Sequence, residues 1–154
     1  MSNLEEILGI SFTKGTKILH ATNSSKKVKK NSIFFGLPGI TQHGSKYSKD
    51  ALDQGASIVV HNDLNGEINN NNIFYIKDLE ERIFNFLNSL YEINISDNNF
   101  FAFTGTNGKS SSSYLCHQLL INLGYESLYI GTLGVQFNQE KFDKTFSSKT
   151  TPDI

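Results

Sequence analysis

Apolar and polar positions in the first part of the chain form short apolar runs separated by longer mixed stretches. Three apolar runs rich in strand-forming residues predict buried strands at residues 32–37, 57–60 and 73–76. The mixed stretch at residues 45–54 predicts a helix, which ends at Gly55. Strands that alternate with helices in this way are typical of an α/β domain with a mainly parallel sheet.

The stretch from about residue 79 to residue 91 has a clear helical period. Its apolar residues recur every three or four positions, on one face of an amphipathic helix. These residues are Leu79, Ile83, Phe86, Leu87 and Leu90. Residues 92–99 are mostly polar, and we interpret them as a linker. The pattern therefore indicates one domain over residues 1–96 and the start of a second domain at residue 97.

A second set of elements follows the linker. The apolar run at residues 100–104 predicts another buried strand. A helix is expected from Lys109 to about Leu123, stopped by Gly124, and residues 127–130 predict the next strand. We therefore expect residues 97–154 to be the truncated beginning of a second, mainly parallel α/β domain.

Composition and charge narrow the function classes only a little. The 154 residues carry a net charge of −1, which gives no general attraction to nucleic acid or to an anionic membrane. The lone cysteine, Cys116, excludes a disulfide within the chain. The sequence shows no leader pattern and no run of about 20 apolar residues, so we expect a soluble cytoplasmic protein. Residues 151–154 show no closing helix or strand pattern, and we expect a fragment of a longer protein.

The turn between the predicted strand at 100–104 and the following helix carries the strongest chemical signal. It reads Thr104-Gly105-Thr106-Asn107-Gly108-Lys109-Ser110. In such a turn glycines let backbone amides point at phosphate, and the helix N-terminus adds positive potential. Lys109 supplies a cation for the β- and γ-phosphates, and Ser110 offers a hydroxyl to Mg²⁺. The sequence therefore predicts an ATP site with Mg²⁺, in which Lys109 is the catalytic cation.

This loop departs from the general phosphate-loop form G-x-x-x-x-G-K-[ST], because Phe103 stands at the place of the first glycine. The alternative is a glycine-rich turn with an incidental Lys-Ser pair, but the strand and helix predicted on either side favour a phosphate loop. The form without the early glycine resembles the phosphate loop of the Mur ligase family, which also includes folylpolyglutamate and cyanophycin synthetases.

A second stretch, within residues 24–39, resembles the N-terminal domain of the Mur ligases that add the third and later peptide residues. Ser25 falls on a family serine that contacts the uridine diphosphate end of the substrate, while Ser24 and Lys26 stand where Asp and Arg are usual. The next loop falls on the family's uracil- and ribose-contacting loop, and His43 there replaces an aspartate. The loop residues implied to contact the substrate are Ile40, Thr41 and Gln42.

A third match separates subfamilies. Residues 131–134, Gly-Thr-Leu-Gly, and the later Thr150-Thr151-Pro152 resemble the ligases that add the third residue to UDP-N-acetylmuramoyl-L-alanyl-D-glutamate. In those ligases the Thr-Thr pair contacts the nucleotide-sugar dipeptide, which implies substrate contacts for Thr150 and Thr151. Lys149 stands where an asparagine often precedes the pair.

The resemblance implies a domain arrangement and a reaction. Residues 1–96 would bind the UDP end of the precursor, and residues 97–154 would begin the central ATP-binding domain. A ligase of this kind transfers the γ-phosphoryl group of ATP to a substrate carboxylate, and the amine of the incoming amino acid then displaces phosphate. We expect the 154-residue chain alone to lack this activity, because an acidic Mg²⁺ ligand, a carbamylated lysine and the amino-acid-binding domain are absent from it.

Three alternatives stay open. The family's D-Ala-D-Ala-adding ligase shares the first-domain pattern. A second alternative is a non-catalytic module that binds the UDP precursor, but the Lys109-Ser110 pair argues against it. A third is a regulatory phosphate-loop ATPase, but the match in the first domain argues against that. The expected partners are a UDP-N-acetylmuramoyl-dipeptide and an amino acid. We expect a monomer that neither binds nucleic acid nor inserts into a membrane.

Overall fold

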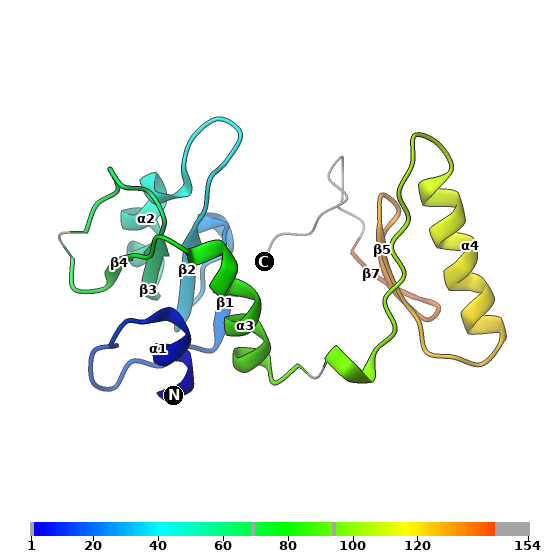
Figure 1. Cartoon of the computed structure of the whole chain (residues 1–154), viewed down its shortest axis with the longest axis horizontal. Coiled ribbons are helices and arrows are strands. Elements are labelled where there is room, and N and C mark those ends of the chain that lie inside the picture. Colours follow the sequence, from blue (N-terminus) through cyan, green and yellow to red (C-terminus); the bar gives the residue numbers. More distant parts are fainter. Residues whose placement is uncertain (1, 69, 94, 144–154) are drawn as a thin grey trace. The chain divides into compact units, whose positions relative to one another are not determined.

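The computed structural model describes residues 2–68, 70–93 and 95–143 (Figure 1). The chain divides into two compact units, and the boundary along the chain lies between Ile95 and Ser96. This division lies within the polar stretch at residues 92–99. None of the described helices is long and apolar enough to cross a membrane.

A four-stranded parallel sheet forms the centre of the first unit. In spatial order its strands are β1 (His20–Thr22), β2 (Ser32–Gly36), β3 (Ala56–His61) and β4 (Ile73–Tyr75). The strands predicted from the three apolar runs are confirmed, and each boundary agrees within one residue. The sequence did not predict β1, because three residues of mixed polarity are too short to show a period.

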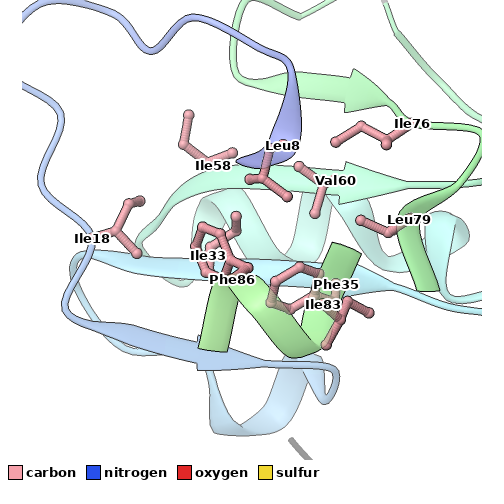
Figure 2. Close-up of a cluster of buried hydrophobic side chains, with 10 residues drawn as sticks. All are labelled: Leu8, Ile18, Ile33, Phe35, Ile58, Val60, Ile76, Leu79, Ile83 and Phe86. Atoms are coloured by element: carbon pink, nitrogen blue, oxygen red, sulfur yellow. The ribbon is translucent and has the colours of Figure 1, made fainter. Parts of the chain in front are cut away.

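Helices cover both faces of this sheet. Successive residues of a strand point to opposite faces, so Ile33 and Phe35 of β2 join one buried cluster and Phe34 joins the other. The larger cluster packs against α1 (Ser2–Leu8) and α3 (Leu79–Tyr91), and Figure 2 shows its buried side chains. The smaller cluster packs against α2 (Ser48–Asp53). A parallel sheet covered on both faces needs strands that are apolar along their length, as β2 and β3 are.

Helix α3 confirms the helix predicted from the 3.6-residue period, and all five apolar residues of its predicted face contact the larger cluster. Phe86 meets Phe35 edge to face, with 5.5 Å between ring centroids. The guanidinium of Arg82 donates to the Ile7 carbonyl at 3.0 Å, which ties α1 to α3. It also donates to the carboxylate of Asp78, the N-cap residue of α3, at 2.8 Å.

The helix predicted at residues 45–54 is present in two pieces. A 3₁₀ turn, η2 (Gly44–Tyr47), leads into α2. The backbone amide of Ser45 is bonded to the His43 ring, and the Ser48 hydroxyl donates to the Ser45 carbonyl at 2.5 Å. These side-chain bonds hold the first turn in the tighter 3₁₀ form, which is common at helix N-termini.

The second unit consists of a helix and an antiparallel sheet. After the short η3 (Ile95–Asp97) come α4 (Lys109–Asn122), β5 (Leu128–Gly131), β6 (Gly134–Phe137) and β7 (Glu140–Asp143). The predicted helix and the strand predicted at residues 127–130 are confirmed, but the described strands of this unit are antiparallel. The buried His117 ring ties α4 to the sheet, since its nitrogens lie 2.9 Å from the Ser127 hydroxyl and 3.1 Å from the Asn138 carbonyl.

Residues 100–104 are not a strand, and that prediction was wrong. The segment joins neither of the two described sheets, and Phe100 and Phe101 are 76% and 63% exposed. A β-strand forms only where its backbone groups pair with a neighbouring strand. The strands β5, β6 and β7 pair with one another, so no described strand lies in a ladder with this segment.

Candidate functional site

Residues 104–110 form a turn that leads directly into α4. Gly105 has φ +139° and Gly108 has φ +79°, conformations that residues with a side chain rarely adopt. Gly108 is also the N-cap residue of α4, so no side chain caps this helix. The two glycines therefore let the chain enter the helix while its N-terminal end stays open.

The backbone amides of this turn are unpaired. Within the part of the chain that the structure describes, no N–H group of residues 105–111 donates to a protein acceptor. The first bond into the helix runs from the Ser112 amide to the Gly108 carbonyl, at 2.8 Å. Free amides at a helix N-terminus, together with the positive end of the helix dipole, form a site suited to an anion and to phosphate above all.

Two side chains of the predicted ATP site lie at this turn. The Lys109 ammonium donates to the carbonyls of Gly105 at 2.7 Å and Thr106 at 3.3 Å. It therefore lies against the turn whose amides are free. The Ser110 hydroxyl lies 2.9 Å from the hydroxyl of Thr132, in the turn between β5 and β6. Thr132 belongs to the Gly-Thr-Leu-Gly motif at residues 131–134, but nothing in that motif indicated a contact with the loop at residues 104–110.

Mg²⁺ fits these residues only as an ion that arrives with a nucleotide. The hydroxyls of Ser110 and Thr132 are oxygen donors, which Mg²⁺ accepts together with phosphate oxygens and water. Across the described residues no three His, Cys, Asp or Glu side chains lie in a metal-binding group. Ser110 is therefore the residue that would hold the ion here, with the nucleotide supplying the charged ligands.

The predicted substrate residues of the first unit lie at one edge of its sheet. The four strands run parallel, so the segments that follow them meet at the carboxyl edge, the usual position of ligands in open α/β sheets. Ser25 follows β1, at the start of η1 (Ser25–Lys27), and is partly exposed. The loop at residues 37–44 follows β2, and its exposed tip carries the other three residues. These are Ile40, Thr41 and Gln42.

Apart from His43, the residues that hold the base of this loop were not identified from the sequence. The His43 ring lies within hydrogen-bond distance of the Ser45 amide and of the Asn62 side chain, so both of its nitrogens already have protein partners. The Ser45 hydroxyl donates to the Asp63 carboxylate at 2.6 Å. This bond, and a second from the Asn65 amide, lower the pKa of Asp63. The signal in the sequence that could have identified Asn62 and Asp63 is their position, because they are polar residues that directly follow a buried strand.

Thr150 and Thr151, the remaining predicted substrate residues, lie outside the described residues, and their role stays a prediction. The described site residues form two sets. The loop at residues 104–110 belongs to the second unit, while Ser25 and the tip of the loop at 37–44 belong to the first.

Comparison with known proteins gives a consistent result. A sequence model of the Mur ligase family, described as its catalytic domain, matches residues 17–86, which lie in the first unit. The match does not include the loop at residues 104–110. The two observations are therefore independent: one concerns the first unit, and the other concerns the phosphate-binding geometry of the second.

Curated relatives extend the match across both units. A UDP-N-acetylmuramoyl-L-alanyl-D-glutamate–2,6-diaminopimelate ligase from Rickettsia conorii is 34% identical over 87% of this chain and 26% of its own length. The enzyme of the same name from Rickettsia bellii is 30% identical over 86% of this chain and 26% of its own. An L-lysine ligase of the same series, from Staphylococcus haemolyticus, is 29% identical over 97% of this chain and 29% of its own. The chain thus spans about a quarter of the length of these relatives.

A solved structure supports the fold. The structure of a UDP-N-acetylmuramoyl-L-alanyl-D-glutamate–2,6-diaminopimelate ligase aligns with a TM-score of 0.65 and 21% identity, over 90% of this chain and 29% of that chain. The α/β fold class predicted from the sequence is therefore confirmed. Relatives of one family match most of this chain's length, and the family's sequence model matches residues 17–86, so the chain is similar in sequence to the Mur ligase family.

Proposed function

We propose that this chain is part of a cytoplasmic, ATP-dependent ligase that adds the third amino acid to UDP-N-acetylmuramoyl-L-Ala-D-Glu during peptidoglycan precursor synthesis. One observation carries the proposal: the turn at residues 104–110 combines free backbone amides with the Lys109 ammonium at an uncapped helix N-terminus. The names of relatives that match most of the chain supply the substrate class.

The chain's own residues would act mainly by position and charge. Phosphoryl transfer from ATP to a carboxylate brings two anions together, so binding geometry and charge stabilisation dominate its catalysis. The free amides of residues 105–110 bind the triphosphate. Lys109 exchanges its bonds to two loop carbonyls for bonds to phosphate oxygens, and it offsets charge as the carboxylate oxygen attacks the γ-phosphorus and ADP leaves. When bound beside Ser110, Mg²⁺ would neutralise further phosphate charge.

The first unit would bind the UDP end of the precursor. Ser25 and the tip of the loop at residues 37–44 would contact it, and Thr150 and Thr151 would contact the dipeptide. We assign residues 1–96 to this role and residues 97–154 to the beginning of the ATP-binding domain, in a monomeric protein. The two kinds of relative add diaminopimelate or lysine, so the proposal rests on the dipeptide acceptor that their names share.

Ligand-induced thermal stabilisation tests the proposal on the 154-residue chain. A ligand that binds only the native state at 100 times its Kd adds about 2.7 kcal/mol to stability. We expect Mg·ATP and UDP-N-acetylmuramoyl-L-Ala-D-Glu each to raise the melting midpoint, and the dipeptide precursor to do so more than the tripeptide form. Lys109→Met should clearly reduce the response to Mg·ATP and leave the response to the precursor. A chain that responds to neither ligand would contradict the proposal.

A further inference from the structure

We propose that Asn62 is a positioning residue that holds the loop at residues 37–44 in the geometry that binds the UDP precursor. The inference rests on the proposed function, which assigns the tip of this loop to the precursor. It concerns a side chain at the end of β3 that acts on the ligand only through the loop.

The loop at residues 37–44 closes tightly at its base. The Gly44 amide donates to the Leu37 carbonyl at 2.8 Å. A Cβ atom at Gly44 would lie 2.9 Å from both the Leu37 nitrogen and the Leu37 oxygen, which no side chain tolerates. The two ends of the loop are thus fixed against each other, while its tip is fully exposed, with Ile40 at 95%. At the tip the Gln42 amide donates to the Tyr47 hydroxyl, so the orientation of the tip depends on this bond and on what holds the base.

The bond from the Ser45 amide fixes the protonation of the His43 ring. This N–H group donates to Nδ1 at 3.1 Å, so Nδ1 carries no proton and Nε2 must carry one. Nε2 then donates to Oδ1 of Asn62 at 3.0 Å, and Nδ2 of Asn62 donates to the Glu80 carboxylate of α3 at 3.3 Å. Each donor meets an acceptor, and only this orientation of the Asn62 amide pairs both of its ends. Asn62 is therefore the central link between the loop and α3.

Asp63, the residue next to Asn62, anchors the base of the same loop through a second side-chain bond. Asp63 accepts from the Ser45 hydroxyl at 2.6 Å and from the Asn65 amide at 3.0 Å. Residues 62 and 63 directly follow β3, whose last four residues have no exposed surface. Two adjacent side chains at the end of a buried strand thus hold His43 and Ser45, and a rigid strand positions a loop that is otherwise exposed.

A loop that is already ordered before the ligand binds loses less conformational entropy on binding, so the ligand binds more tightly. Ordering a flexible backbone costs conformational entropy, and pre-organisation removes part of that cost from the affinity. The link through Asn62 depends on the histidine of this chain. An ionised aspartate at this position would accept hydrogen bonds but could not donate one to Asn62. His43 and Asn62 therefore act as a pair.

Calorimetric titration of UDP-N-acetylmuramoyl-L-Ala-D-Glu into the 154-residue chain tests the inference. Asn62→Ala removes both bonds, and we expect an affinity about 10-fold weaker, as for the loss of one or two net hydrogen bonds. Asn65→Ala is the matched control, because Asn65 contributes only its backbone amide to this network, and it should bind as the parent chain does. Mg·ATP affinity should be unchanged in both variants.

A donor–acceptor exchange separates positioning from a loss of folding. Asn62→Asp still accepts from His43 but cannot donate to Glu80 and faces its charge, so it should weaken binding at least as much as Asn62→Ala. Adding Glu80→Gln supplies a new amide donor to the aspartate, and the double variant should recover to within about 3-fold of the parent. Parent-like affinity in both Asn62 variants, or no recovery in the double variant, would overturn the inference. Failure of the proposed function would appear instead in the parent chain, as an absence of precursor binding.

Discussion

Two pairs of adjacent phenylalanines differ sharply in their surroundings. Phe34 and Phe35 in the first unit have no exposed surface, whereas Phe100 and Phe101 in the second unit are 76% and 63% exposed. Both pairs lie in short apolar runs that end at a glycine-containing loop. The first pair belongs to β2, which has a neighbouring strand on each side and helices over both faces, while the second joins no described sheet. An apolar run thus indicates a need for burial, and the available neighbours decide whether it becomes a strand.

The largest expected effect tests this comparison directly. Phe35→Ala should destabilise the first unit by about 3–5 kcal/mol, because it opens a cavity in a covered core. Phe101→Ala should change stability by less than about 0.5 kcal/mol, as expected for an exposed position. Urea unfolding followed by far-ultraviolet circular dichroism measures both. Equal losses from the two variants would show that the exposed pair is buried in solution.

The next effect concerns the chemistry that the second unit carries. Lys109→Met removes a charged donor beside the free amides and should weaken Mg·ATP binding by about 10- to 100-fold, as hydrogen bonds to charged groups contribute about 1.5–3 kcal/mol. Calorimetric titration measures the affinity. Lys14→Met, at an exposed position of the first unit, is the matched control. If both variants lost the same Mg·ATP affinity, the phosphate-binding role would not belong to Lys109 of the second unit.

A smaller effect is expected at Thr132, whose hydroxyl contacts that of Ser110. Thr132→Val keeps the shape of the side chain but loses the hydroxyl, and should weaken ADP binding about 5-fold in the presence of Mg²⁺, as for one lost hydrogen bond. In the presence of a chelator the affinity should match that of the parent, because Ser110 would then hold no ion. Thr132→Ser should restore the Mg²⁺-dependent part. A loss of the same size with and without Mg²⁺ would assign Thr132 a purely structural role.

The smallest effect is a pH dependence in the first unit. The bond from the Ser45 hydroxyl lowers the pKa of Asp63, and the bond from Arg82 lowers the pKa of Asp78. A carboxyl whose pKa is lower in the folded state stabilises the fold above its unfolded pKa, and this contribution is lost as the pH falls through the lowered value. Asp63→Asn should therefore reduce the loss of stability on acidification, measured by urea unfolding at neutral and acid pH. Asp53→Asn, an exposed position at the end of α2, is the control.

Local patterns predicted much of the fold but not the contacts between distant segments. Strands β2, β3 and β4 were predictable because each is a short apolar run, and α3 was predictable because its apolar residues recur with the helical period. Each is buried on the side that its own pattern indicates. The segment at residues 100–104 was predicted wrongly because a strand needs a partner that its own residues do not specify. The phosphate-binding turn was recognisable because its glycines and Lys109 are contiguous. Asn62 and Thr132 were missed because their bonds join elements distant in the sequence.

Nuclear magnetic resonance of the ¹⁵N-labelled chain during titration with Mg·ATP tests the central claim most directly. If the turn binds the triphosphate through its backbone, the amide resonances of residues 105–110 should shift most and saturate together, and Lys109→Met should need about 10- to 100-fold more Mg·ATP to reach the same shifts. Saturation that moves resonances elsewhere in the chain and leaves these six amides unchanged would contradict the assignment of the turn as the ATP site.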